Sequence, residues 1–242
     1  MVVSLYDLTN TLMAQQTAEY NMKDDVHTFL DTIQQVSESL LKQVDGGSGL
    51  LYGVSLCLGG YLDEEAGVLK YSILTPEWGR NIPLKQLLAD RFPNTEITVD
   101  NVARMSACAA VLDNQKYLEK RVATIYTDVG VSACYINRGH VEHGNHSLIG
   151  EIGLMAMAVP NAGAYETTAP ALFSTLVNDN TICGEILKNK KRLQDSMMYQ
   201  YRDGLKIEHV FKAANDGDPF AGEVVRETAW LFSAALNNIV VN

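Results

Sequence analysis

Residues 51–63 read Leu-Tyr-Gly-Val-Ser-Leu-Cys-Leu-Gly-Gly-Tyr-Leu-Asp, a short apolar run that ends in two glycines. This pattern is typical of a buried strand that enters a tight turn, where glycine permits a sharp bend and the close approach of a ligand. A second short strand is expected at 96–99, directly before Asp100 and Asn101. Since ligands of α/β proteins bind beyond the carboxyl ends of strands, Gly60 and Asn101 are candidate ligand contacts. An ordinary turn and a helix N-cap are the alternative interpretations of these two positions.

Strand and helix patterns continue on both sides of this segment. Strands are expected at 2–8, 11–16, 51–58, 68–74, 96–99, 122–127 and 131–137, and helices at 23–44, 84–92, 101–112 and over most of the chain from 168. The last helix is expected to begin after Asp218, a good N-cap residue. Strands dominate the first half and helices the last third, so we expect an α/β protein with two lobes, 1–110 and 111–242.

The composition is that of a soluble globular protein, with 47% hydrophobic and 20% charged residues. The 19 basic and 29 acidic residues give a formal net charge of −10, which disfavours non-specific binding of this chain to nucleic acid. Neither a long apolar run nor a basic N-terminus followed by an apolar segment is present, so no membrane span and no signal peptide are expected. The 4 cysteines form no C-x-x-C pair, which disfavours a cysteine zinc site and fits a reducing cytoplasm.

Two isolated carboxylates lie in otherwise uncharged stretches of the second half. Glu151 lies within 148–159, and Glu166 within 162–171. A lone carboxylate in such a setting must be solvated, paired or bound to a ligand, because burying it unpaired is costly. Two carboxylates and the Asn101 amide suit the vicinal hydroxyls of a sugar, which donate hydrogen bonds that ionised acceptors strengthen.

Several other kinds of site are disfavoured by the sequence. The histidines within 140–146 invite a metal hypothesis, but the glycines around them predict a loop without helical ligand spacing. Neither the phosphate-binding motif G-x-x-x-x-G-K-[ST] nor the dinucleotide-binding motif G-x-G-x-x-G occurs in the sequence. At the turn where a phosphate chain would be held, Asp128 stands beside the single glycine Gly130, and its charge would repel phosphate. No metal and no cofactor are therefore expected.

Taken in chain order, these segments resemble the ROK family, which groups sugar kinases with sugar-responsive transcriptional repressors. The resemblance rests on 53–63 (its strand and P-G-x-V-D turn, with Gly59 in place of proline), Trp78 with 83–92 (its W…P-L-x-x-L…F segment), 150–153 (its G-E-I-G-H signature) and 214–220 (its A-x-x-G-D-x-x-A region). The resemblance implies an actin-like (ribonuclease H-like) α/β fold of two lobes, with mixed sheets and flanking helices.

The departures from the family pattern fall on the catalytic positions. Asp100-Asn101-Val102 stands where family kinases have E-N-D, whose aspartate is the general base that activates the sugar hydroxyl. Valine at position 102 cannot accept a proton. The signature histidine is Leu154, the cysteine-rich zinc motif is absent, and the glycine-rich phosphate loop is replaced by a segment with Asp128, Gly130, Ser132 and Cys134. The resemblance implies that Gly60, Asn101, Glu151 and Glu166 remain as sugar contacts.

The sequence therefore predicts a non-catalytic sugar-binding effector domain of a ROK-type transcriptional regulator of carbohydrate metabolism. A sugar or sugar phosphate would be held by the Gly60 backbone, Asn101, Glu151 and Glu166, without a catalytic residue, metal or cofactor. A cytoplasmic homodimer is expected, with no membrane contact. DNA would be bound only through a winged helix-turn-helix outside this chain.

Two alternatives stay open. The first is a divergent sugar kinase that phosphorylates a hexose or N-acetylhexosamine with ATP, using Asp100 or a histidine of 140–146 as base. The second is a structural remnant that only dimerises. The family's first strand, with its D-x-G-x-T turn, would precede residue 2, and its last strand would follow residue 242. We therefore expect part of a longer regulator, in which the first sheet lacks a partner strand.

Overall fold

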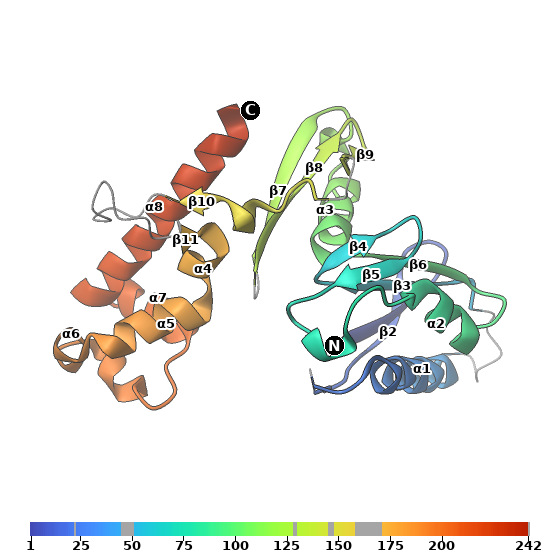
Figure 1. Cartoon of the computed structure of the whole chain (residues 1–242), viewed down its shortest axis with the longest axis horizontal. Helices are drawn as coiled ribbons and strands as arrows, with labels where there is room; N and C mark the ends of the chain where they lie inside the picture. Colours follow the sequence, from blue (N-terminus) through green and yellow to red (C-terminus); the bar gives the residue numbers. More distant parts are fainter. Residues whose placement is uncertain (22, 45–50, 128–129, 145–147, 158–170, 242) are drawn as a thin grey trace. The chain divides into compact units, whose positions relative to one another are not determined.

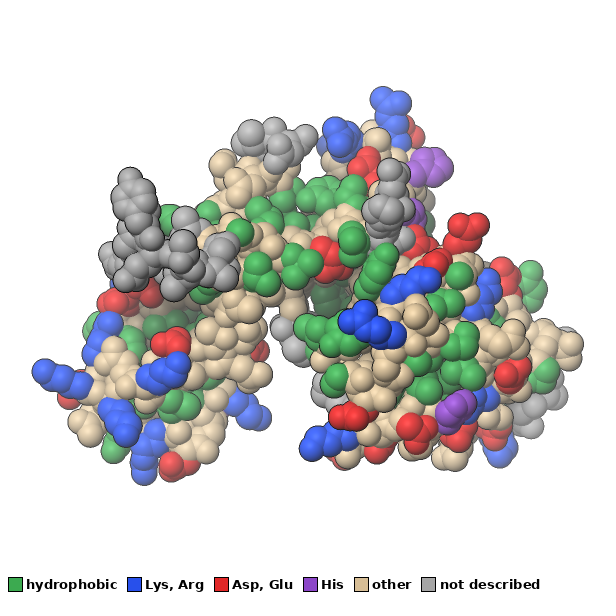
Figure 2. Space-filling model, in the orientation of Figure 1, with side chains coloured by type: hydrophobic (Ala, Val, Ile, Leu, Met, Phe, Trp, Pro, Cys, Tyr) green, Lys and Arg blue, Asp and Glu red, His purple; other side chains and the backbone are tan. Residues whose placement is uncertain are grey.

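The computed structural model describes residues 1–21, 23–44, 51–127, 130–144, 148–157 and 171–241. Contacts divide the chain into unit 1 (Met1–Lys120 and Ile136–Leu148) and unit 2 (Arg121–Tyr135 and Ile149–Asn242). The division into 1–110 and 111–242 stays a prediction. Acidic and basic side chains are interspersed on the face that Figure 2 shows. Within the described part of the chain, no helix is long and apolar enough to cross a membrane.

Unit 1 contains most of the strands (Figure 1). Its elements are β1 (Val2–Tyr6), β2 (Leu12–Thr17), α1 (Val26–Gln43), β3 (Gly53–Leu58), β4 (Tyr61–Asp63), β5 (Val68–Tyr71), η2 (Pro76–Trp78), α2 (Leu84–Arg91), β6 (Glu96–Asn101), α3 (Val102–Leu112), η3 (Gln115–Tyr117) and β9 (His140–Val141). The strand β8 (Val131–Asn137) lies between β7 (Arg121–Thr127) and β9 in a three-stranded sheet, and the boundary between the units falls within it.

Helix α1 confirms the amphipathic pattern of 23–44. Asp25 caps it by accepting hydrogen bonds from the backbone N–H groups of His27 and Thr28. Its buried residues recur at helical spacing and are Val26, Phe29, Leu30, Ile33, Val36 and Leu40. Four of them belong to a core shared with α2 and β6, whose other buried members are Leu62, Leu69, Trp78, Leu84, Leu88, Phe92, Ile97 and Val99. The burial of this one apolar stripe explains why the helix forms here.

The ladder that positions the candidate site is the parallel pair β3–β6, with register from Gly53↔Glu96 to Leu58↔Asn101. Parallel pairing brings the carboxyl ends of both strands to the same edge, so the turn after Leu58 starts beside Asn101. The hairpins β1–β2 and β4–β5 are antiparallel. Among the described residues, β1 pairs only with β2 and β3 only with β6.

Unit 2 is mostly helical after β8, as predicted. Its remaining elements are η4 (Ile152–Leu154), β10 (Ala156–Met157), β11 (Ala171–Leu172), α4 (Phe173–Val177), α5 (Asp179–Lys188), α6 (Lys190–Gln194), η5 (Met197–Tyr201), α7 (Ile207–Asn215) and α8 (Pro219–Val241). The predicted cap of the last helix is confirmed, because Asp218 Oδ1 accepts from Ala221 N (2.8 Å). Asp218 Oδ2 also accepts from Met197 N (2.6 Å), which ties η5 to the start of α8.

Asp218 makes the stability of unit 2 sensitive to acid. Burial raises the pKa of this carboxyl, but hydrogen bonds from Ala221, Met197, Ser196 and Phe220 outweigh burial and lower the pKa below its ordinary value of 3.8. A lowered folded-state pKa contributes stability that is present above pH 3.8 and lost as the pH falls through the folded-state pKa. Asp218→Ala should cost about 1–2 kcal/mol near neutral pH, measured by urea unfolding.

The matched control for this prediction is Asp216→Ala. Asp216 is half exposed and pairs with Lys212 at a spacing of four residues. Its removal should change the free energy of unfolding by less than about 0.5 kcal/mol. Equal losses for both variants at neutral pH would contradict a structural role for the buried cap.

Candidate functional site

Gly60 forms the turn between β3 and β4 and adopts a conformation that favours glycine. Its φ is +143°, and an added Cβ would lie 2.9 Å from Leu69 Cδ1 and 2.9 Å from the Tyr71 carbonyl oxygen. A side chain here would therefore strain the turn and collide with β5. The Gly60 carbonyl accepts a hydrogen bond from Asn101 Nδ2 at 3.1 Å. Two predicted site residues are thus in direct contact.

Asn101 is the N-cap of α3, so the helix-cap interpretation of this residue is confirmed. Its Oδ1 accepts from Ala103 N at 2.8 Å while its Nδ2 donates to Gly60. A side-chain amide has a second hydrogen on nitrogen and a second lone pair on oxygen, so these contacts leave capacity for a ligand. The ligand-binding role of Asn101 stays a prediction. Val102, at the family's base position, is the first residue of α3 and is half-buried.

A cluster of charged residues adjoins Asn101 that the sequence analysis did not identify. Asp100 Oδ1 accepts hydrogen bonds from Asn101 N (2.6 Å) and from Arg104 Nε (2.7 Å), and Arg104 Nη2 lies at ion-pair distance from the same oxygen (2.7 Å). Arg104 Nη2 lies 3.5 Å from Glu64 Oε2. The Arg104 side chain is only 8% exposed, so the guanidinium is buried between the two carboxylates. The spacing of four residues between Asp100 and Arg104 could have indicated their ion pair from the sequence. Glu64 lies forty positions before Arg104, so no local pattern indicates that pair.

His143 extends this cluster. Its Nδ1 lies 2.6 Å from Glu64 Oε1, at ion-pair distance but without hydrogen-bond geometry. The structure thus places Asp100 and His143, two of the residues proposed as alternative bases, at opposite ends of one ion-pair cluster. His140, a third, is an exposed residue of β9 outside this cluster. Asp100 Oδ1 already accepts two hydrogen bonds and is paired with the Arg104 guanidinium. An acceptor engaged in this way is poorly suited to take a proton from a sugar hydroxyl.

The Asp100 carboxylate also affects the pKa of two neighbouring thiols, Cys57 and Cys108. Burial and then the Asp100 carboxylate raise the pKa of Cys57, which is opposite Asp100 in the β3–β6 ladder. Burial and Asp100 also raise the pKa of Cys108 on α3, while Arg104 lowers it. Both thiols are therefore kept protonated, and neither is suited to act as a nucleophile.

Glu151 belongs to unit 2, at the start of η4, and is partly exposed. Its neighbours Gly150 and Gly153 pack against the backbone of β8. An added Cβ on Gly153 would lie 2.5 Å from the Val131 carbonyl oxygen, and one on Gly150 would collide with the carbonyl group of Ala133. The Ala133 N–H donates to the Gly150 carbonyl at 2.7 Å. The close approach of β8 thus explains both glycines around Glu151, a role that the sequence analysis missed.

Three other residues that the sequence analysis singled out are Glu166, Asp128 and Leu154. Glu166 and Asp128 lie outside the described residues. Leu154, at the position of the signature histidine, is 59% exposed. Within the described part of the chain, no group of three or more His, Cys, Asp or Glu side chains is placed to hold a metal ion.

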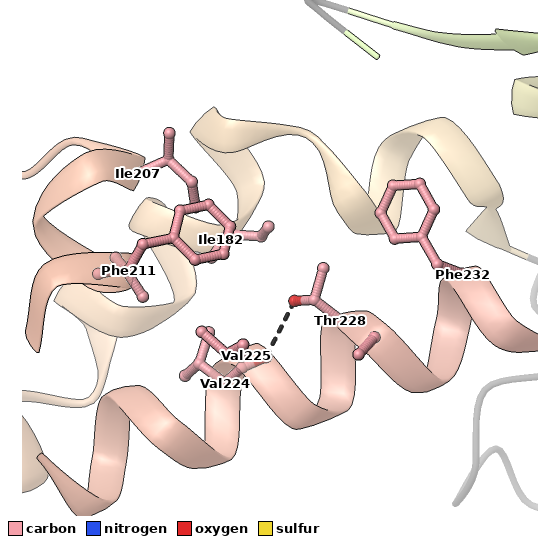
Figure 3. Close-up of a pocket in the computed structure, with 9 residues that line it drawn as sticks. Ile182, Ile207, Phe211, Val224, Val225, Thr228 and Phe232 are labelled. Carbon is pink, nitrogen blue, oxygen red and sulfur yellow. Dashed lines mark hydrogen bonds between the residues drawn. The ribbon is translucent and has the colours of Figure 1, made fainter. Parts of the chain in front are cut away.

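A separate cavity of about 340 Å³ lies between α5, α7 and α8 of unit 2 (Figure 3). Its lining residues are Ile182, Ile207, Val210, Phe211, Val224, Val225, Thr228, Ala229 and Phe232. The one hydroxyl among them, on Thr228, donates to the Val224 carbonyl within α8 at 2.9 Å, the dashed line in Figure 3. A sugar needs several hydrogen-bonding partners, so this cavity is unsuited to one.

Comparison with known proteins identifies the family. The model of the ROK family matches residues 1–242, the whole chain. The chain belongs to the ROK family. A glucokinase of Halalkalibacterium halodurans is 25% identical over 84% of this chain and 63% of its own length. The DNA-binding transcriptional dual regulator NagC of Escherichia coli is 24% identical over 92% of this chain and 53% of its own length. The chain thus spans between half and two-thirds of these relatives.

Solved ROK structures agree with this assignment. A ROK family transcriptional regulator, described as a homologue of the E. coli MLC protein, superposes with a TM-score of 0.81 at 19% identity, over 99% of this chain and 59% of its own. A ROK glucokinase of Streptomyces griseus in complex with glucose and AMPPNP gives a TM-score of 0.72 at 16% identity, over 98% of this chain and 75% of its own. The actin-like α/β fold expected from the sequence is confirmed. Regulators and kinases both occur among the relatives.

Proposed function

We propose that this chain is a non-catalytic sugar-binding domain of a ROK-type transcriptional regulator of carbohydrate metabolism. The observation that carries the proposal is Val102, the first residue of α3, which the resemblance to the family matches to the general base of its kinases. The two polar residues before Val102 already have partners, because Asn101 caps α3 and Asp100 forms an ion pair with Arg104. Valine at this position cannot take a proton from a sugar hydroxyl, which supports a domain without phosphoryl transfer.

In the proposed role, Gly60, Asn101, Glu151 and Glu166 are the sugar contacts. Sugar binding shifts the equilibrium between two conformations, provided that the ligand has different affinities for them. The similarity to NagC and to the MLC homologue supports a regulator. A homodimer in the cytoplasm and DNA binding through a module outside this chain belong to the same proposal.

The second candidate is a divergent sugar kinase, favoured by the similarity to the H. halodurans glucokinase. In this case Asp100 or His143 acts as the base, after release from the ion-pair cluster. Such an enzyme binds ATP and consumes it in the presence of a hexose, whereas the proposed effector domain does neither.

Thermal unfolding across a panel of hexoses, N-acetylhexosamines and their 6-phosphates, with Mg-ATP in parallel, tests the proposal. A ligand at about 100 times its Kd stabilises a folded protein by about 2.7 kcal/mol, a shift of several degrees. We expect such a shift with one sugar and none with ATP. A shift with ATP would favour the kinase, and no shift with any sugar would contradict the proposal.

Glu151→Gln tests the proposed contact in unit 2. It keeps the shape of the side chain but removes the charge, and a hydrogen bond to a charged group is worth about 1.5–3 kcal/mol. The affinity for the stabilising sugar should therefore fall about 10- to 100-fold in titration calorimetry. Glu227→Gln is the control, because Glu227 is an exposed carboxylate of the same unit. Equal affinities for the two variants would exclude Glu151 as a contact.

A further inference from the structure

The cluster of Glu64, Asp100 and Arg104 contains the only cation that, among the described residues, forms an ion pair or hydrogen bond with Asp100 or Asn101. Both Arg104 contacts are to carboxylates: 2.7 Å to Asp100 Oδ1 and 3.5 Å to Glu64 Oε2. An arginine held in this way is neutralised and fixed in place. It offers no free positive charge to a ligand.

This cluster is continuous with the proposed ligand contacts of unit 1. Asp100 Oδ1 accepts from the Asn101 backbone N–H at 2.6 Å, and the Asn101 amide donates to the Gly60 carbonyl at 3.1 Å. A ligand that binds Asn101 or Gly60 therefore lies within a few ångströms of the Asp100 carboxylate. At such a distance, the sign of the local charge affects which ligands bind.

The charge of the cluster is negative. Glu64 and Asp100 contribute two carboxylates and Arg104 one guanidinium, which gives these three residues a net charge of −1. The raised pKa of both Cys57 and Cys108 agrees with a negative potential here, because Asp100 contributes to each after burial.

The neighbouring cations on and after β5 are also engaged. Lys70 pairs with Asp63 at 3.1 Å. The Arg80 guanidinium lies over the ring of Tyr71, 4.8 Å from its centroid. Both of these cations therefore already have a partner within unit 1.

We propose that Arg104 is a specificity-determining residue: by pairing with Asp100 and Glu64, it makes the ligand site select uncharged sugars and reject sugar phosphates. This inference rests on the proposed function and narrows its ligand class. A phosphate group would meet the net negative charge of the cluster, whose one cation, Arg104, is already paired with Asp100 and Glu64. A sugar hydroxyl, in contrast, donates hydrogen bonds to carboxylate and carbonyl oxygens.

Titration calorimetry of each sugar in the panel against its 6-phosphate tests the inference. The parent sugar should bind at least about tenfold more tightly, the factor expected when a ligand charge lies within about 10 Å of an uncompensated carboxylate. Asp100→Asn removes one partner of Arg104 and one negative charge. In this variant, the ratio of the affinity for the parent sugar to the affinity for its 6-phosphate should fall at least about tenfold. Asp113→Asn, an exposed carboxylate at the C-terminal end of α3, should leave the ratio unchanged.

Glu64→Gln is the second variant, because Asp100→Asn also removes an acceptor of the Asn101 N–H and could impair folding. It leaves Asp100 intact and should move the ratio in the same direction. Tighter binding of the phosphate to the native chain would overturn the inference, as would an unchanged ratio in Glu64→Gln. If no sugar and no phosphate binds, the proposed function itself fails, which is a distinct result.

Discussion

Replacement of Gly150 by alanine should unfold unit 2 or destabilise it by more than about 3 kcal/mol, the range of strained backbone combined with overpacking. Gly150 has a φ of +92°, and its added Cβ would collide with the carbonyl group of Ala133 on β8. The strand cannot move aside cheaply, because Ala133 N donates to the Gly150 carbonyl at 2.7 Å. Urea unfolding followed by circular dichroism measures the loss.

Gly184→Ala is the matched control in the same unit. Gly184 lies within α5, and an added Cβ there meets no atom within 4 Å. Alanine has the higher helix propensity, so this variant should be stabilised by up to about 1 kcal/mol. A Gly150→Ala protein as stable as the native chain would contradict the packing of 149–153 against β8.

Replacement of Arg104 by methionine should cost about 3–5 kcal/mol of unfolding free energy, the usual result of removing one partner of a buried ion pair. The side chain is 8% exposed, and its loss leaves Asp100 and Glu64 as two carboxylates without their shared cation. Adding Asp100→Asn to this variant should recover part of the loss, because it removes one unpaired charge.

Lys212→Met is the control, since Lys212 and Asp216 have the same spacing of four residues but are 63% and 51% exposed. An exposed pair contributes about 0–1 kcal/mol. Equal losses of unfolding free energy in Arg104→Met and Lys212→Met would show that the burial of Arg104 has no energetic consequence.

The elements that the sequence predicted well are those that local patterns determine. The helical spacing of 23–44 and the cap Asp218 specify α1 and the start of α8 before any tertiary contact is known. Such features depend on neighbours within a few residues.

The candidate site was only partly predictable, for a physical reason. Gly60 and Asn101 were found because each lies at the end of a strand, but their mutual hydrogen bond requires the parallel register of β3 and β6. The pairing of Arg104 with Glu64 joins residues forty positions apart, so no local pattern reveals it. The glycines beside Glu151 are likewise required by their close packing against β8, which lies outside the 150–153 motif.

The most direct test of the central claim, that this ROK chain binds a sugar without phosphorylating it, is a turnover measurement. The chain is incubated with Mg-ATP and the sugar that stabilises it, and sugar phosphate and ADP are quantified by mass spectrometry over many hours. The account predicts sugar binding with no ATP-dependent product above a protein-free control, because Val102 accepts no proton. Sustained formation of sugar phosphate that Asp100→Asn or His143→Ala abolishes would contradict it and identify a kinase.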